Sequence, residues 1–431
     1  MKINFDFLLF GATGDLALRK IFPSLYDAFL NDLLHEDFKI IATGRSKLSL
    51  DEFKQKLNDK SKIHLKDVTK WNSFLEKITY ESVDINSIDD FKKLKMCLRN
   101  GVDNVIYFSI SPEFFITCCK NLSELNMNEA NVRIVLEKPL GMSLDECRAI
   151  NESVAKYYKE EQIYRIDHYL GKNMVKELLE FRKNNPHINA FLNKDYVKSI
   201  ELSVLERLGV ESRGEFYDSC GALRDMLQNH MLQMLALFMI DVNSTNIRKA
   251  KLDFFNSLEK INKRDVIKAQ YIKNEDSLSY KDELNVAKDS LTETFVAIKT
   301  SSNQENYKGV PIYLRTGKRM AENRVYFTIN FKNNGYLYIE IQPNPKMKLL
   351  LNINDNYKEF EIGFSDIEKM PPYERLILNV INKDLSSFNE KEELESAWKW
   401  VQSVIDDKDF NMQEYPAYTN GINFKDCEFK L

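Results

Sequence analysis

The stretch Phe5-Asp6-Phe7-Leu8-Leu9-Phe10-Gly11-Ala12-Thr13-Gly14-Asp15-Leu16 decides the fold of the N-terminal part of the chain. Its first six residues are mostly apolar and predict a short buried strand, which the glycines then break. A helical pattern follows over 15–34. A glycine turn between a first strand and a helix lets backbone amides approach a pyrophosphate. We therefore expect a dinucleotide to contact Gly11, Thr13, Gly14, Asp15 and Leu16.

Strands and helices alternate through the first third of the chain. Further apolar strands are predicted over 38–43, 102–110 and 133–136, with helical stretches between several of them. This alternation predicts parallel βαβ units and hence a Rossmann-like α/β coenzyme domain over residues 1–166. The spacing of Gly11 and Gly14 departs from G-x-G-x-x-G, so by itself it also fits a turn that binds no ligand.

The pattern changes after Asp167. Strands are predicted over 197–205, 312–316, 325–331, 336–342 and 349–353, and Asn333-Asn334-Gly335 is typical of a hairpin turn. Clustered strands predict a mainly antiparallel sheet, and so an α+β domain over 167–431. A helix over 221–240 is apolar on most sides and should be buried. The stretch 256–289 shows no clear pattern.

Composition limits the classes of partner. The 431 residues include 61 Lys plus Arg and 65 Asp plus Glu, a formal net charge of −4 that gives no reason to expect nucleic acid or an anionic membrane. We see neither a signal-peptide pattern nor an apolar run long enough to span a bilayer. The six cysteines show no metal-ligand spacing, so we expect no metal site, and reduced thiols favour a cytoplasmic location.

The end of the second strand bears on the choice of cofactor. It reads Thr43-Gly44-Arg45-Ser46 and lacks the carboxylate that would bind the ribose 2′-hydroxyl of NAD. Arg45 can pair with a 2′-phosphate and Ser46 can donate a hydrogen bond to it. We therefore predict NADP as cofactor and leave use of NAD open, since Arg45 could also be an ordinary loop residue.

Four further segments, which follow the Gly11–Lys20 turn in order, resemble the glucose-6-phosphate dehydrogenase family. They are Glu137-Lys138-Pro139-Leu140-Gly141, Arg165-Ile166-Asp167-His168-Tyr169-Leu170-Gly171-Lys172, Arg224-Asp225-Met226-Leu227-Gln228-Asn229-His230 and Leu314-Arg315-Thr316-Gly317-Lys318. The resemblance implies a coenzyme domain followed by a large-sheet α+β domain, and oxidation of glucose 6-phosphate at C1 with NADP. It also implies a homodimer or homotetramer, usually joined through that sheet.

The resemblance assigns roles to individual residues. It makes His230 the general base and Asp167 its orienting partner, a pairing that suits removal of a hydroxyl proton. A lone histidine on a buried helix could instead be a structural core residue. Further residues that the resemblance places at the substrate are His168, Tyr169 and Lys172 for the phosphate, Glu206 and Asp225 for the hydroxyls, and Lys20, Lys138, Lys318 and, more weakly, Gln342; Lys138 is also expected to lie against the cofactor.

Departures from the family pattern and two rival functions stay open. Asn323 stands where many bacterial relatives have a second lysine, and Arg324 follows it. One rival is a two-domain sugar dehydrogenase of the glucose–fructose or inositol dehydrogenase type, whose substrates often lack phosphate. The other is a catalytically silent NADP-binding relative, which would lack the base or the phosphate-binding residues.

Overall fold

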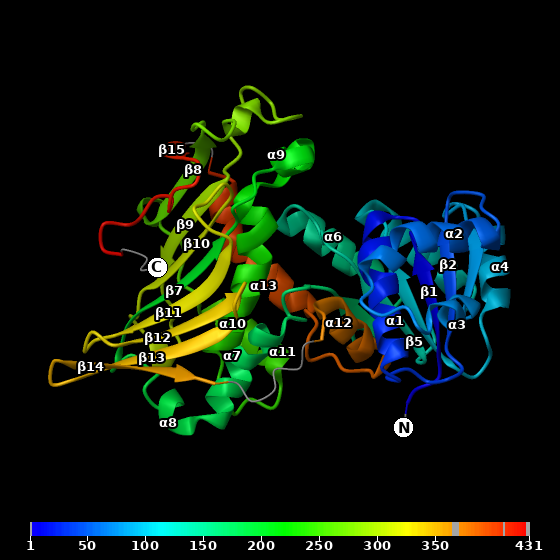
Figure 1. Cartoon of the computed structure of the whole chain (residues 1–431), viewed down its shortest axis with the longest axis horizontal. Coiled ribbons are helices and arrows are strands. Elements are labelled where there is room, and N and C mark those ends of the chain that lie inside the picture. The colour runs from blue at the N-terminus through cyan, green and yellow to red at the C-terminus, as the bar shows by residue number, and fades with distance from the viewer. Residues whose placement is uncertain (1, 364–369, 408–409, 428–431) are drawn as a thin grey trace. The chain divides into compact units, whose positions relative to one another are not determined.

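A computed structural model of the chain describes residues 2–363, 370–407 and 410–427, and the chain forms two compact units (Figure 1). The first unit contains Met1–Lys172 and Lys369–Lys391, and the second contains Asn173–Glu368 and Glu392–Leu431. The first unit thus extends beyond residue 166, where the sequence analysis placed a domain boundary. It also includes Lys369–Lys391, a segment that lies within the second domain predicted over 167–431.

The first unit is built on a parallel sheet, as the sequence predicted, and the sheet has six strands, of which Ile78–Ser82 and Ile163–Arg165 were not predicted. Its strand order is β3-β2-β1-β4-β5-β6, which reverses direction between β1 and β4. Both faces are covered, so β1 is buried along its whole length. The strands are β1 Phe5–Phe10, β2 Lys39–Gly44, β3 Ile78–Ser82, β4 Asp103–Phe108, β5 Val132–Leu136 and β6 Ile163–Arg165.

Helices connect these strands (Figure 1). The first connection is a π-helical segment, η1, that continues directly into α1. The helical elements are η1 Ala17–Ile21, α1 Phe22–Leu30, α2 Leu50–Lys60, α3 Trp71–Glu76, α4 Ile88–Cys97, α5 Phe115–Glu124 and α6 Leu144–Ala155, with short 3-10 turns η2 Lys62–His64, η3 Pro112–Phe114 and η4 Glu160–Gln162. The polar residue in β1, Asp6, is fully buried and accepts a 2.8 Å hydrogen bond from Nε of Arg99.

The segment that returns to the first unit contains α12 (Pro372–Ile381). One side of this helix is apolar, and Leu376, Ile377 and Val380 join the core that α1 and β1 also line. Gly171 permits this approach, because a Cβ there would lie 2.5 Å from the carbonyl oxygen of Pro372. Sequence patterns show that the helix is amphipathic, but they do not show which sheet it covers.

The second unit contains the large mainly antiparallel sheet that the sequence predicted. Nine strands pair in the order β14-β13-β12-β11-β7-β10-β9-β8-β15, and only β7·β10 and β8·β15 are parallel among them. The strands are β7 Val197–Leu205, β8 Val266–Ile272, β9 Phe295–Thr300, β10 Ile312–Gly317, β11 Arg324–Phe331, β12 Tyr336–Gln342, β13 Lys346–Ile353, β14 Asn356–Ile362 and β15 Gln413–Pro416.

A long helical stretch packs against the middle of this sheet. It consists of α9 (Gly214–Ala222), the π-helical η6 (Leu223–Met231) and α10 (Leu232–Met239), and η6 contacts β7 and β10. This is the predicted buried helix over 221–240, and every residue of α10 is buried. The remaining helices are α7 Asn173–Asn184, α8 Pro186–Asn189, α11 Ile247–Ser257 and α13 Lys391–Ile405, with 3-10 turns η5 Glu211–Arg213, η7 Lys263–Asp265, η8 Tyr280–Asp282 and η9 Glu305–Tyr307.

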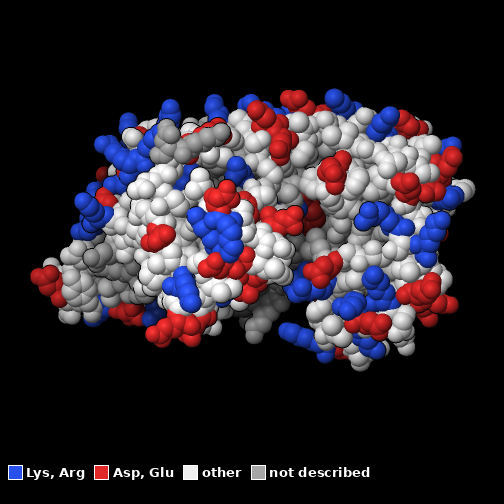
Figure 2. Space-filling view, turned by 90° about the horizontal axis from the view of Figure 1, so that it is seen from above, with Lys and Arg blue, Asp and Glu red and all other residues white. Residues whose placement is uncertain are grey.

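Basic and acidic side chains are interspersed over the face drawn in Figure 2. Among the described residues, no helix combines the length and apolar character needed to cross a bilayer.

Candidate active site

The turn after β1 forms one wall of a cleft in the first unit. Gly11 has φ = +76°, and a Cβ at this position would lie 2.0 Å from the carbonyl oxygen of Ser109, which follows β4. Only glycine fits this conformation and this close approach. The amide of Gly14 donates to the carbonyl of Gly11 at 2.9 Å, and the amide of Leu18 donates to that of Gly14 at 3.1 Å. The tight turn therefore leads directly into a helix start.

This cleft lies at the carboxyl ends of β1, β2, β3 and β4, beside the point where the strand order reverses. Its volume is about 590 Å³, within the range of sites for small ligands. Among the residues that we expect to contact a dinucleotide, Gly11, Thr13, Gly14 and Arg45 line this cleft, whereas Asp15, Leu16 and Ser46 do not. The sequence analysis missed other lining residues, which follow β3 and β4: Asp84, Asn86, Ser109, Ser111 and Glu113.

Arg45 lines the cleft and Ser46 follows it in the chain, and both side chains are exposed. Their backbone is held in place from β3, since the hydroxyl of Tyr80 donates to the carbonyl of Ser46 at 2.6 Å. Gly44 leaves room for that phenol, because a Cβ there would lie 2.9 Å from its oxygen. The guanidinium is thus presented to solvent from a fixed stretch of main chain.

The end of β5 carries a buried carboxylate, Glu137. The hydroxyl of Tyr107 donates to it at 2.5 Å, and Tyr373 of α12 forms a second hydrogen bond to it. Burial raises the pKa of Glu137 to about 7, although the phenols and the adjacent Lys138 act in the opposite direction. The next peptide bond, Lys138–Pro139, is cis, and both residues are partly exposed.

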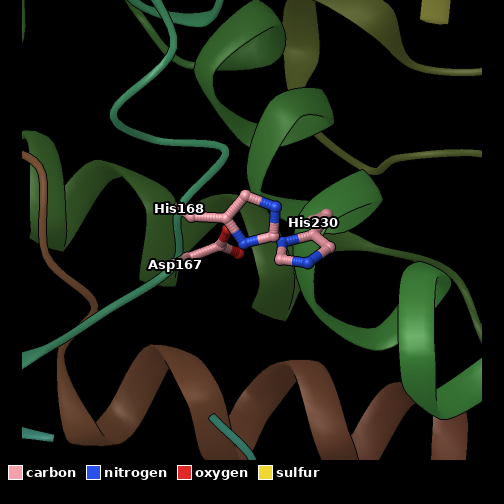
Figure 3. A group of neighbouring side chains, drawn as sticks. All are labelled: Asp167, His168 and His230. Atoms are coloured by element: carbon pink, nitrogen blue, oxygen red, sulfur yellow. The ribbon is translucent and has the colours of Figure 1, made fainter. Parts of the chain in front are cut away.

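The turn after β6 groups the predicted phosphate-binding side chains. Asp167 is 1% exposed, and its Oδ1 accepts a 2.9 Å hydrogen bond from the amide of Tyr169. Nζ of Lys172 lies 3.3 Å from the centre of the Tyr169 ring, and the rings of His168 and Tyr169 are 5.0 Å apart. An imidazole, a phenol and an ammonium group therefore share one short turn of the first unit, and Figure 3 shows the imidazole of His168 beside Asp167.

Tyr373 also belongs to this group, and sequence reasoning missed it. Its ring lies parallel to that of His168 at a centroid distance of 6.4 Å, while its hydroxyl bonds Glu137. The helix that carries it, α12, is about two hundred residues from His168 in the sequence, so no local motif indicates the contact. Tyr373 links the end of β5 to the turn after β6.

His230 lies on η6 of the second unit and is 2% exposed (Figure 3). Its own amide donates to Oδ1 of Asn229 at 2.6 Å, and the amide nitrogen of the Asn229 side chain donates to the carbonyl of Arg224 at 2.8 Å. Asp225 lies in the first turn of η6 and is partly exposed. The same π-helical segment thus positions the predicted base and a predicted sugar-binding carboxylate.

Glu206 and Lys318 meet where β7 and β10 end. Nζ of Lys318 donates to Oε2 of Glu206 at 2.7 Å and lies 4.9 Å from the ring centre of Tyr217. Burial raises the pKa of Tyr217, and the nearby carboxylates of Asp225 and Glu206 raise it further. Tyr217, which the sequence analysis did not single out, therefore lies among three of the predicted substrate residues.

Two family models together match most of the chain. Residues 8–177 match the NAD binding domain of glucose-6-phosphate dehydrogenase, and residues 179–427 match its C-terminal domain. The chain belongs to the glucose-6-phosphate dehydrogenase family. A relative from Helicobacter pylori (strain ATCC 700392 / 26695), glucose-6-phosphate 1-dehydrogenase, is 40% identical over 94% of this chain and 93% of its own.

Two solved structures of glucose-6-phosphate dehydrogenases are similar along almost the whole chain. One, described as in complex with its substrate glucose-6-phosphate, has a TM-score of 0.92 and 31% identity, and covers 98% of this chain and 96% of its own. The other, from Mycobacterium avium, has a TM-score of 0.88 and 27% identity over 97% and 95%. The family's nicotinamide dinucleotide-binding domain corresponds to the first unit.

The structure also locates three further residues of this family member that the sequence analysis discussed. Lys20 is exposed on η1, and Gln342 is partly exposed at the end of β12, opposite Val325. Arg324, next to the atypical Asn323, forms a 3.0 Å ion pair with Glu322. The Arg324 guanidinium is thus already neutralised by its own turn.

Proposed function

We propose that this protein is a glucose-6-phosphate dehydrogenase that converts D-glucose 6-phosphate to 6-phosphogluconolactone with NADP, the entry step of the oxidative pentose phosphate pathway. The observation that carries the proposal is the combination of groups on one chain. A dinucleotide-type cleft occupies the first unit, the turn after β6 groups His168, Tyr169 and Lys172, and a buried helix carries His230. A sugar phosphate that is oxidised needs all three.

The cleft residues fit a dinucleotide phosphate. The absence of a side chain at Gly11 allows close approach of the backbone, and the helix start after Gly14 favours anions. Arg45 and Ser46 would hold the 2′-phosphate, Thr13 and Gly14 the pyrophosphate, and Lys138 the nicotinamide end. Bound there, NADP supplies the acceptor for the hydride. With no carboxylate at the end of β2, NAD should bind more weakly.

In this proposal, side chains of the protein accept the proton of the C1 hydroxyl. The C1 hydroxyl would give its proton to the imidazole of His230, the hydrogen on carbon C1 would leave as hydride to the bound nicotinamide, and C1 would become the carbonyl carbon of the lactone. Asp167 would orient the imidazole and stabilise its protonated form. This role requires Asp167 of the first unit and His230 of the second to act on one sugar.

The remaining side chains would bind the sugar phosphate. A phosphate monoester carries close to two negative charges, which His168, Tyr169 and Lys172 are placed to satisfy. Glu206, Asp225 and Lys318 would orient the hydroxyls, and Lys138 would lie near C1. Lys20 and Gln342 are weaker candidates, supported only by the family resemblance.

Assembly and location are also part of the proposal. We infer a homodimer or homotetramer joined through the large sheet, which the mass in solution from light scattering would test. A cytoplasmic location is supported by the six cysteines, which all lie among the described residues and form no disulfide there.

A direct test is a steady-state assay of nicotinamide reduction with glucose 6-phosphate or glucose, each with NADP or NAD. We expect glucose 6-phosphate with NADP to give the highest kcat/KM. A lower KM for free glucose, with no gain from the phosphate, would favour a sugar dehydrogenase of the glucose–fructose type. Absence of turnover with every combination would favour a silent relative.

A further inference from the structure

A buried carboxylate outside the substrate cluster contacts the start of the helix that carries Asp225 and His230. Glu293 is 6% exposed and lies two residues before β9 begins at Phe295. Its Oε1 accepts a 2.9 Å hydrogen bond from the amide of Leu223, the first residue of η6. Its own carbonyl accepts a 3.0 Å bond from the amide of Ala222. The consecutive backbone amides of Ala222 and Leu223 therefore both donate hydrogen bonds to Glu293.

The backbone of the helix is shaped to receive this carboxylate. Gly221 interrupts the helical stretch with φ = +65° and ψ = 178°. A Cβ on Gly221 would lie 2.6 Å from Oε1 of Glu293. Glycine is therefore needed for the conformation and also for the clearance. The break lies inside α9, two residues before η6 begins at Leu223, and the carboxylate of Glu293 lies against it.

The residue after Glu293 contacts the other substrate cluster. The carbonyl of Thr294 accepts a 2.9 Å hydrogen bond from the amide of Lys318, and the hydroxyl of Tyr415 contacts both Thr294 and the carbonyl of Lys318. Residues 293 and 294 therefore join the helix of Asp225 and His230 to the strand end of Lys318. All of these contacts lie within the second unit.

The segment before Glu293 is itself fixed to α9. Asp218 of that helix accepts hydrogen bonds from the hydroxyls of Ser290, at 2.5 Å, and Tyr280, at 2.7 Å. The hydroxyl of Thr292 donates to the carbonyl of Asp218 at 2.6 Å. These hydrogen bonds to Asp218 hold the segment that precedes Glu293 against α9, next to the break at Gly221.

From these contacts we infer that Glu293 is a positioning residue, which sets the start of η6 and thereby the placement of Asp225 and His230 relative to Lys318. The inference rests on the proposed function for its kinetic consequence. Glu293 does not need to touch the sugar, because it acts through the Leu223 amide. A small displacement of catalytic groups is enough to lower turnover strongly.

The test compares Glu293→Ala with Glu293→Gln in the full-length protein. Alanine removes the acceptor, whereas glutamine keeps an amide oxygen at the same reach. We expect Glu293→Ala to lower kcat/KM for glucose 6-phosphate by about 10- to 100-fold, the usual effect of losing a buried acceptor. The KM for NADP should change less than about twofold, and glutamine should restore most of the activity.

The matched control is Glu201→Ala. Glu201 is also a buried carboxylate of the second unit, 4% exposed, but it bonds Asn330 and Ser199 and not the helix. We expect this control to lower thermal stability without a selective change in kcat or in the sugar-phosphate KM. Equal kinetic effects of the two alanine variants would overturn the inference, because a general loss of stability would then explain both.

Amide hydrogen exchange provides a readout that does not depend on activity. Peptides that span 222–231 should exchange faster in Glu293→Ala than in the wild type, while peptides from β1 and β4 stay unchanged. Unchanged exchange over 222–231 in a folded variant would overturn the inference. If Glu293→Ala does not fold, the activity of Gly221→Ala tests the inference instead. The new Cβ should displace the carboxylate of Glu293. Full activity of Gly221→Ala would overturn the inference.

The two proposals fail separately. A wild-type protein that does not oxidise glucose 6-phosphate contradicts the proposed function, and the exchange measurement still decides whether Glu293 sets the start of η6. An active wild type with a fully active Glu293→Ala variant contradicts only the positioning role.

Discussion

Lys318 and Glu206 form a 2.7 Å ion pair in which the lysine side chain is only 10% exposed. Because the lysine is almost buried, its ammonium has one well-defined direction, and its charge is offset by a carboxylate that is 34% exposed. The ion pair therefore holds both side chains in place, while the carboxylate of Glu206 remains accessible to a hydroxyl of the substrate.

Removal of the ammonium should weaken sugar-phosphate binding. We expect Lys318→Met to raise the KM for glucose 6-phosphate by about tenfold or more, the usual range for a hydrogen bond to a charged group, with the KM for NADP nearly unchanged. Steady-state kinetics with each substrate varied in turn checks this. Lys308→Met, at an exposed lysine of the same unit, is the control; equal effects of the two variants would contradict the role of Lys318.

Lys172 should act mainly on binding of the phosphate. We expect Lys172→Ala to raise the KM for glucose 6-phosphate by about 10- to 100-fold, because a charge-assisted contact to a dianion is lost. Its kcat should fall much less. The matched control is Lys176→Ala, one helical turn further on and exposed. An unchanged KM in Lys172→Ala would contradict its assignment.

Arg45 should set the preference for NADP. Its exposed side chain lines the cleft, so removal should alter the binding of the cofactor and leave the fold unchanged. We expect Arg45→Ala to raise the KM for NADP by about tenfold or more and to change the KM for NAD little. Lys47→Ala, two residues further on, is the control. A parallel loss for both cofactors would show that Arg45 does not read the 2′-phosphate.

Glu137 should make the stability of the first unit depend on pH. Burial raises the pKa of its carboxyl from 4.5 to about 7 in the folded protein. The folded state therefore holds the proton more tightly than the unfolded state, so the stabilisation is complete below pH 4.5 and is lost as pH rises through about 7. The loss is on the order of 3 kcal/mol.

The measurement is the denaturation midpoint of the wild type and of Glu137→Gln across this range. The midpoint of the wild type should fall relative to that of Glu137→Gln as pH rises from about 4.5 to about 7. Glu161→Gln, at an exposed carboxylate, is the control. A constant difference between wild type and Glu137→Gln over the whole range would contradict the raised pKa.

Much of the fold was predictable because its strands are locally distinctive. The predicted strand 197–205 coincides with β7, because Ile200, Leu202 and Val204 alternate with polar residues in the pattern of a strand. β8 was missed because Lys268 and Gln270 interrupt its apolar pattern. Both side chains are nevertheless buried, and they donate to the carbonyls of Val404 and Ser290, respectively. Because these hydrogen-bond acceptors are distant in sequence, the residues around β8 do not indicate that its polar side chains are buried.

The candidate site shows the same division between local and distant information. The turn of His168 and the segment of His230 were identified because each lies in a contiguous motif. Tyr373 and Tyr217 were missed because each reaches its cluster only through tertiary packing. The return of α12 to the first unit, which brings Tyr373 to His168, is likewise a property of the folded chain.

The central claim is that the imidazole of His230 removes the proton from the C1 hydroxyl. The most direct measurement is the rate of nicotinamide reduction by His230→Asn at saturating glucose 6-phosphate and NADP, compared with the wild type. We predict that kcat falls by about two orders of magnitude or more while the KM for glucose 6-phosphate stays close to that of the wild type. Near-normal turnover by His230→Asn would contradict the account.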